Sequence, residues 1–245
     1  MCIFMKKENS QGPISQINFS LRKLTLRRPL LSLAIVSGLL LANLIQTPAL
    51  ADFEAGWTAY QNGNFAKALK EWRVLAKKGD AKAQFNLGVM YDEGRGVKED
   101  RQKAINWWVK AAERKNKEAQ HNLGMTYLFG SGVNIDYVKA VSWLKKASNQ
   151  GSARSQYSLG KMYSEGLGVK KDKTEAFNWI MRAAESGVYQ AQYNLGKIFR
   201  DGRGVERDAK KAAQWFLAAA KQGYAKAQNH IGVRLARGEG IAKNE

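Results

Sequence analysis

The chain has 245 residues, 44% of them hydrophobic, and its 40 Lys or Arg against 21 Asp or Glu give a formal net charge of +19. This apolar content is enough to bury a sizeable core, and the single cysteine, Cys2, excludes a disulfide framework. The charge favours anionic partners or surfaces. A solvated basic face that only keeps the chain soluble is the alternative.

Residues 1–51 are predicted to be a secretory signal. Basic residues between positions 22 and 28 precede an apolar run over residues 30–45, and the sequence Ala49-Leu50-Ala51 follows. This order is typical of a leader that is cleaved, here after Ala51. An uncleaved membrane anchor is the alternative, although the run is shorter than the roughly 20 apolar residues of a spanning helix.

Cleavage there would give a mature protein that begins at Asp52 and is periplasmic or secreted. It would remove Cys2, so that no thiol remains for a disulfide, a metal or catalysis. Six Lys or Arg and one Glu would leave with the leader, and the remaining 34 basic and 20 acidic residues give a formal net charge of +14.

Residues 52–79 are predicted to form a short helix pair that caps the N-terminal end of the following array. Its small and aromatic residues resemble those of a tetratricopeptide-type pair: Gly56, Ala59, Gly63, Phe65, Ala68 and Trp72.

Residues 80–245 repeat one pattern every 36 residues. Two columns show the recurrence: Trp107, Trp143, Trp179 and Trp215, and Gly88, Gly124, Gly160, Gly196 and Gly232. A fixed period of this size is typical of a solenoid, in which each unit buries its apolar face only against its neighbours. We predict four full copies and a fifth copy that is truncated.

Each copy is predicted to hold two antiparallel helices. In the first copy Ala83, Leu87 and Tyr91 lie on one face of the first helix, because they are spaced by four residues. Gly88 lies on the same helix, where glycine costs about 1 kcal/mol relative to alanine. Its recurrence therefore predicts the close approach of another helix.

Gly94 and Gly96 are predicted to end the first helix in left-handed conformations, and Asp100 is predicted to cap the second helix. The recurring tryptophans, of which Trp107 is the first, are predicted to be buried and to fill the space beside the helical glycines. We therefore expect Trp143→Ala to lower the free energy of unfolding by about 3–5 kcal/mol. Lys115 stands where later copies have glycine, and this predicts a less relaxed turn.

The chain resembles the Sel-one-like repeat family, a branch of the tetratricopeptide-like α-solenoids, through the pattern A-x-x-x-L-G-x-x-Y-x-x-G-x-G-V-x-x-D-x-x-x-A-x-x-W-x-x-x-A-A. The resemblance implies an all-α fold, a right-handed superhelical solenoid of antiparallel helix pairs. It also implies a scaffold for protein complexes that has no catalytic residues, and bacterial members of this family are often exported.

The repeat also explains the residues that could carry chemistry. His121 and His230 replace aromatic and asparagine residues of other copies, so they are predicted to be parts of a helix face rather than ligands or bases. The acidic turn at residues 92–96 suggests calcium, but later copies lose most of the carboxylates that this ion needs. We predict no enzymatic activity, no cofactor, no metal and no small-molecule substrate.

The predicted binding surface is a concave groove lined by the first helices. The sequence places six candidate partner-binding residues along it: Phe85, His121, Tyr157, Tyr193, Lys161 and Lys197. Aromatic rings beside basic residues suit an extended or helical protein segment with acidic character. The alternative is that these rings pack between neighbouring first helices.

Nucleic acid is another ligand for aromatic rings beside positive charge, and the predicted export disfavours it. Electrostatic attachment to an anionic envelope polymer or to lipid headgroups is the second hypothesis for the function. Salt distinguishes it from a specific protein scaffold, because rising ionic strength screens purely electrostatic attachment.

Overall fold

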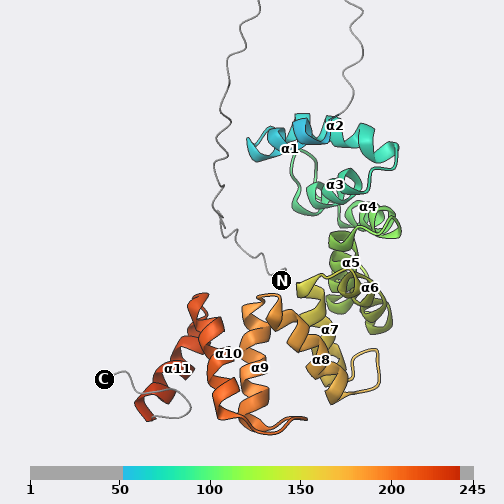
Figure 1. Ribbon diagram of the computed structural model, residues 1–245. Coiled ribbons are helices and arrows are strands. Elements are labelled where there is room, and N and C mark those ends of the chain that lie inside the picture. Colours follow the sequence, from blue (N-terminus) through green and yellow to red (C-terminus); the bar gives the residue numbers. More distant parts are fainter. Residues whose placement is uncertain (1–51, 238–245) are drawn as a thin grey trace, which may run out of the picture. The chain divides into compact units, whose positions relative to one another are not determined.

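The computed structural model describes residues 52–237, with side chains up to residue 232 (Figure 1). The predicted leader, residues 1–51, and the last residues of the predicted fifth copy, 238–245, lie outside the described residues. The helices are α1 (Phe53–Gln61), α2 (Phe65–Lys77), α3 (Ala81–Glu93), α4 (Arg101–Glu113), α5 (Lys117–Phe129), α6 (Tyr137–Asn149), α7 (Ala153–Glu165), α8 (Lys173–Glu185), α9 (Tyr189–Asp201), α10 (Ala209–Lys221) and α11 (Ala225–Arg237).

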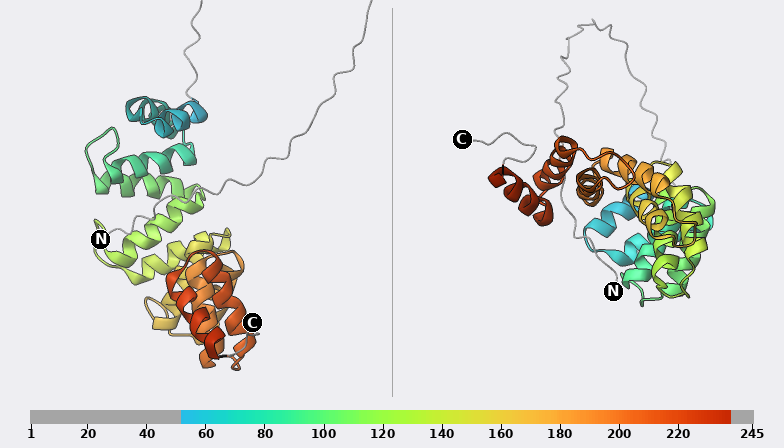
Figure 2. Two further views of the ribbon diagram at one scale, coloured as in Figure 1. Left: turned by 90° about the vertical axis from the view of Figure 1, so that its left-hand side faces the viewer. Right: turned by 90° about the horizontal axis from the view of Figure 1, so that it is seen from below.

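Each helix packs chiefly on the helices that precede and follow it in the chain (Figures 1 and 2). All regular structure within residues 52–237 is helical, and the predicted all-α solenoid of helix pairs is confirmed. None of the helices in this described range is long and apolar enough to cross a bilayer.

Aspartates cap the second helices of the copies as predicted. The carboxylate of Asp100 accepts a hydrogen bond from the backbone amide of Lys103 at 2.9 Å, and Asp136, Asp172 and Asp208 cap α6, α8 and α10 in the same way. The first amides of a helix have no partner within the helix, so these acceptors fix where each second helix begins.

The turn between the two helices of a copy contains glycines with left-handed backbone conformations. Gly94, the C-cap of α3, has a φ of 65°, and Gly96 has a φ of 71°. An added Cβ on Gly96 would lie 2.8 Å from the Cβ of Phe65, the first residue of α2. The turns of the later copies pack on the preceding second helix in the same way: Gly132 on Arg101, Gly168 on Tyr137 and Gly204 on Lys173.

Lys115 has a φ of 62°, and no other non-glycine residue in the described part of the chain has a positive φ. We expect Lys115→Gly to raise the free energy of unfolding by about 1 kcal/mol, because the left-handed conformation strains an L side chain by roughly 1–2 kcal/mol. Part of this gain is lost to the greater freedom of glycine in the unfolded chain.

Denaturant unfolding of the parent and the variant measures this effect. Gly151→Lys is the matched control, because Gly151 takes the same place one copy later and an added Cβ would meet nothing within 4 Å. It should lower stability by a similar amount. A lower unfolding midpoint for Lys115→Gly would show that the turn is not strained.

The helical glycines admit a side chain from the second helix of their own copy, which confirms the predicted close approach. The pairs are Gly88 with Trp108, Gly124 with Leu144, Gly160 with Ile180 and Gly196 with Phe216. The prediction that the Trp107 column fills this space is therefore wrong by one residue. A helix turns by about 100° per residue, so adjacent residues face different sides.

The tryptophan column is only partly covered. Trp107, Trp143 and Trp215 are half-buried, whereas Trp179 is buried. Over three of these rings lies the cationic side chain of the residue three positions later in the chain. The distances from the cation to the ring centroid are 4.6 Å for Lys110 over Trp107, 4.1 Å for Lys146 over Trp143 and 4.8 Å for Arg182 over Trp179. The cations shield the outer faces of the rings, and this contact is favourable in its own right.

Candidate binding surface

The first helices of the four full copies share one side whose residues are half-buried or exposed. Positions i, i+4 and i+7 fall on one face of an α-helix. In α3, α5, α7 and α9 these positions are half-buried or exposed, whereas Ala83, Leu87, Gly88 and their equivalents are buried. We name this surface the first-helix face: Lys82, Asn86, Val89, Glu118, Asn122, Met125, Arg154, Ser158, Lys161, Gln190, Asn194 and Lys197.

The first-helix face is continuous between copies. The hydroxyl of Ser158 in α7 donates to the sulfur of Met125 in α5 at 3.5 Å. The amide of Asn194 in α9 donates to the hydroxyl of Tyr157 in α7 at 2.8 Å. A ligand that lies across the first helices would therefore meet side chains of more than one copy.

The four predicted aromatic residues reach from one first helix towards the next. Phe85 packs on the cluster that contains Ala119 and Leu123 of α5, and Tyr157 accepts the hydrogen bond from Asn194. The ring of Tyr193 lies 5.5 Å from that of His230 in α11, between centroids.

His121 is buried, and its Nδ1 lies 2.8 Å from the hydroxyl oxygen of Ser155 in α7. The other three aromatic residues, Phe85, Tyr157 and Tyr193, are half-buried. Phe85, His121, Tyr157 and Tyr193 thus each lie against a neighbouring first helix, which is the alternative arrangement considered for these rings. Partner binding by their remaining exposed edges stays a prediction.

His121 is held as a neutral imidazole. Burial, with a smaller contribution from the positive charge of Arg154, lowers its pKa to about 4. Its partner Ser155 also lies 2.9 Å from the hydroxyl of Ser152. In the other copies an aromatic ring and an alanine take the places of His121 and Ser155: Phe85 and Ala119, Tyr157 and Ala191, Tyr193 and Ala227.

Lys161 and Lys197 both lie on the first-helix face, in α7 and α9. Lys161 is exposed, and the ammonium of half-buried Lys197 lies 5.8 Å from the centroid of the Tyr193 ring. Neither forms an ion pair with another described residue. Together with exposed Arg154 they make this part of the face basic.

A glutamine for which the sequence pattern predicted no role recurs in every copy: Gln84, Gln120, Gln156, Gln192 and Gln228. Each side-chain amide donates to the backbone carbonyl eight residues earlier, in the last turn of the preceding second helix, at 3.0, 3.0, 3.3, 3.2 and 3.4 Å in chain order. Each carbonyl also accepts a backbone amide of the turn that ends its helix, so the glutamine supplies a second hydrogen bond to it. The glutamine therefore joins one copy to the next, and its recurrence every 36 residues marks it in the sequence.

The acceptor oxygen of this glutamine is satisfied in alternate copies. Gln150 donates to Oε1 of Gln120 at 2.7 Å, and Gln222 donates to Oε1 of Gln192 at 2.9 Å. The third copy has Ser186 at this place, and Oε1 of its glutamine is buried without a partner. The first copy has arginine there and shows the same unpaired oxygen.

We expect Ser186→Gln to raise the free energy of unfolding by about 1 kcal/mol, because it supplies the missing donor to Gln156. Gln150→Ser, the reciprocal change, should lower it by about 1–2 kcal/mol, since it leaves Oε1 of Gln120 buried and unpaired. Denaturant unfolding measures both. Changes of the same sign in the two variants would show that this pairing does not control stability.

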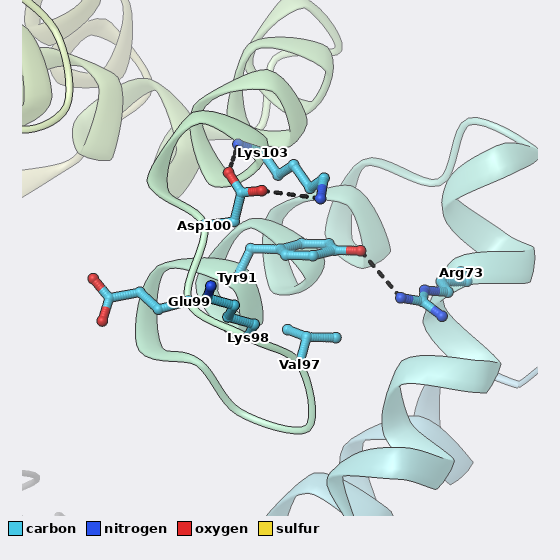
Figure 3. A pocket seen from close by; sticks show the side chains of 7 residues that line it. All are labelled: Arg73, Tyr91, Val97, Lys98, Glu99, Asp100 and Lys103. Carbon is cyan, nitrogen blue, oxygen red and sulfur yellow. Dashed lines mark hydrogen bonds and ion pairs between the residues drawn. The ribbon is translucent and has the colours of Figure 1, made fainter.

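A surface pocket of about 440 Å³ lies between α2 and the turn of the first copy (Figure 3). Its lining residues are Arg73, Tyr91, Val97, Lys98, Glu99, Asp100 and Lys103. Arg73 donates to the hydroxyl of Tyr91 at 3.1 Å, and the carboxylate of Asp100 binds both the backbone amide and the ammonium of Lys103 at 2.9 Å.

These hydrogen bonds, first that from the backbone amide of Lys103, hold the pKa of Asp100 below its usual value. The charged carboxylate of Asp100 thus caps α4 and is not poised as a proton acceptor. Among the described residues, no three His, Cys, Asp or Glu side chains are grouped so that they could hold a metal ion.

Comparison with known proteins identifies the repeated unit. The Sel1 repeat matches residues 81–116, 117–152, 153–188, 190–224 and 225–245. A protective antigen of uropathogenic Escherichia coli strains that displays an SLR fold is 40% identical, with a TM-score of 0.69. The match covers 72% of this chain and 38% of the antigen, so this chain spans well under half of that relative.

A Sel1 repeat protein from Oxalobacter formigenes is 32% identical over 79% of each chain, with a TM-score of 0.73. No curated protein matches the sequence. The first three matched segments each contain one helix pair of the structure, α3 with α4, α5 with α6 and α7 with α8. The chain therefore belongs to the Sel1 repeat family, whose members are generally non-catalytic scaffolds for protein–protein interaction.

Proposed function

We propose that this protein is a non-catalytic scaffold of the cell envelope that binds an acidic protein segment along the first-helix face. The observation that carries the proposal is the row of open first-helix positions, which becomes basic in the third and fourth copies. Arg154, Lys161 and Lys197 lie there without an ion pair to any described residue. Their charges are therefore available to a partner.

The polar residues of the face would hold the backbone of the bound segment. Asn86, Asn122 and Asn194 take the same place in three copies, and an asparagine amide can both donate and accept hydrogen bonds. The half-exposed rings of Tyr157 and Tyr193 add apolar contact. The lysines would mainly set the association rate and its response to salt.

Export rests on the leader pattern of residues 1–51. N-terminal sequencing of the protein from an envelope fraction tests it, and we expect the mature chain to begin at Asp52. Recovery of residues 1–51 on that protein would instead favour an uncleaved anchor.

A random-peptide display selection on the immobilised protein tests the first-helix face. We expect the recovered peptides to be rich in Asp and Glu. Their affinity, measured by fluorescence anisotropy, should fall by about tenfold or more in the double variant Lys161→Glu/Lys197→Glu.

The matched control is Lys145→Glu/Lys221→Glu, which reverses two exposed lysines on second helices and changes the net charge equally. We expect it to bind the selected peptides nearly as well as the parent does. Equal weakening in both variants, with binding that fades steeply as salt is added, would favour electrostatic attachment to an anionic surface. Full binding by Lys161→Glu/Lys197→Glu would exclude the first-helix face as the site.

A further inference from the structure

The turn of the second copy exposes four large apolar side chains. Phe129, Ile135, Tyr137 and Val138 are 63%, 56%, 37% and 67% exposed. They come from the end of α5, the turn itself and the start of α6, and we name them the second-hairpin patch. Elsewhere in the described part of the chain, large apolar side chains are comparably exposed only singly, at Val74 and Leu217. An exposed cluster of this kind is typical of an interaction site.

The repeat supplies an internal comparison, because the other copies are mostly charged or polar at the same four positions. The counterparts are Glu93, Glu165 and Asp201 for Phe129; Glu99, Lys171 and Arg207 for Ile135; Arg101, Lys173 and Ala209 for Tyr137; and Gln102, Thr174 and Lys210 for Val138. The turn of the second copy has a backbone conformation like that of the first copy, because Gly130 and Gly132 have φ values of 68° and 78°, close to those of their counterparts there. The backbone therefore does not require apolar residues at these four positions.

Turn glycines lie against two residues of the second-hairpin patch, Ile135 and Tyr137. An added Cβ on Gly130, the residue after Phe129, would lie 2.9 Å from Cγ1 of Ile135, so Ile135 lies against the turn. The turn of the third copy approaches the other end of the patch, where Gly168 lies against the backbone of Tyr137. Leu167 of the same turn packs on the core cluster that α6 contributes to.

The charge beside the second-hairpin patch differs between its two sides. On the side of the third copy, exposed Lys170 and Lys171 follow Gly168 in the same turn, and neither forms an ion pair with a described residue. On the side of the first copy, Gly132 lies against Arg101, which pairs with carboxylates at 3.0 and 3.8 Å. The cation that lies against the turn on the first-copy side is therefore paired, whereas Lys170 and Lys171 are not.

We propose that the second-hairpin patch binds a second protein partner, through a segment that places apolar side chains next to acidic ones. Burial of the exposed rings and aliphatic groups supplies the affinity, because it removes apolar surface from water. Lys170 and Lys171 set the orientation of the segment, because they attract its acidic end. The patch lies on the hairpin turns and not on the first-helix face, so one chain can hold two partners.

The decisive variant gives the second copy the residues of the first copy at these positions: Phe129→Glu, Ile135→Glu, Tyr137→Arg and Val138→Gln. Random-peptide display on the parent, with counter-selection on this variant, supplies the probe. We expect the recovered peptides to combine apolar and acidic residues, and to bind the variant at least about tenfold more weakly in fluorescence anisotropy.

Two further variants separate the parts of the proposal. Lys170→Gln/Lys171→Gln should weaken binding and remove most of its salt dependence. Lys161→Glu/Lys197→Glu, on the first-helix face, should leave binding to these peptides unchanged. If the fourfold variant does not fold by circular dichroism, Phe129→Glu/Val138→Gln changes the two most exposed residues only and should still weaken binding.

Three results would overturn the proposal. One is a selection that recovers no peptide able to distinguish the parent from the variant. Another is patch-dependent self-association of the parent in analytical ultracentrifugation, because a second copy would then cover these residues. The third is patch-dependent flotation with phosphatidylserine vesicles, which would assign the patch to a membrane surface.

Discussion

Leu144→Ala is expected to lower the free energy of unfolding by about 3–4 kcal/mol, whereas Trp143→Ala, one residue earlier in α6, is expected to cost about 1–2 kcal/mol. Leu144 is fully buried in the space beside Gly124, so its truncation leaves a cavity in the core. Trp143 is half-buried and carries Lys146 over its ring at 4.1 Å, so its removal uncovers less apolar surface.

Denaturant unfolding of the two variants measures the difference, with Ser142→Ala as a control at an exposed position of the same helix. The order of the two losses is the test. A loss at Trp143 that exceeds the loss at Leu144 would restore the expectation based on the tryptophan column. It would also contradict the contact between Leu144 and the helical glycine.

Acidification from pH 7 to pH 4.5 is expected to lower the free energy of unfolding by about 2 kcal/mol through His121 alone. The pKa of this imidazole is about 4 in the folded chain, against an ordinary value of 6.5. Between these values the unfolded chain binds more protons than the folded chain, so stability falls as the pH falls. The effect is complete below about pH 4 and absent well above pH 6.5.

The double variant His121→Phe/Ser155→Ala separates this effect from other titrations, because it gives the second copy the ring and methyl group found at Phe85 and Ala119. We expect its stability to change less between pH 7 and pH 4.5, by about the 2 kcal/mol assigned to His121. The capping carboxylate of Asp100 has a pKa below its ordinary value of 3.8, so its contribution is lost only at lower pH. An equal response to pH in the parent and the variant would exclude His121 as the source.

The helix pairs, their period and their ends follow from the amino-acid sequence alone. Asp100 and its equivalents recur because each second helix needs an acceptor for its first amides. Gly94 and Gly96 recur because only glycine takes left-handed conformations without strain. The strained turn at Lys115 was predicted for the same reason. These requirements act over a few residues, so a repeated sequence displays them directly.

The candidate site was predictable only in outline. The sequence placed Lys161 and Lys197 along the first helices, and the structure shows both on the first-helix face. Tyr157 was assigned to the same surface, yet it is half-buried and its hydroxyl accepts a hydrogen bond from Asn194 of the next first helix. The glutamine that recurs at Gln120 and its equivalents was equally visible in the sequence. Its recurrence did not show which group it contacts, here a backbone carbonyl of the preceding second helix.

Which side chains fill the space between helices is visible only in the packed fold. Trp143 recurs unchanged in four copies and suggested the core, whereas the position that meets the helical glycine holds a different residue in each copy: Trp108, Leu144, Ile180 and Phe216. Packing fixes the volume that must be filled and the direction from which it is filled, and several side chains can meet both conditions. The recurring glycine thus indicates that another helix approaches, but which residue of that helix fills the space depends on a rotation of about 100° per residue that only the packed helices reveal.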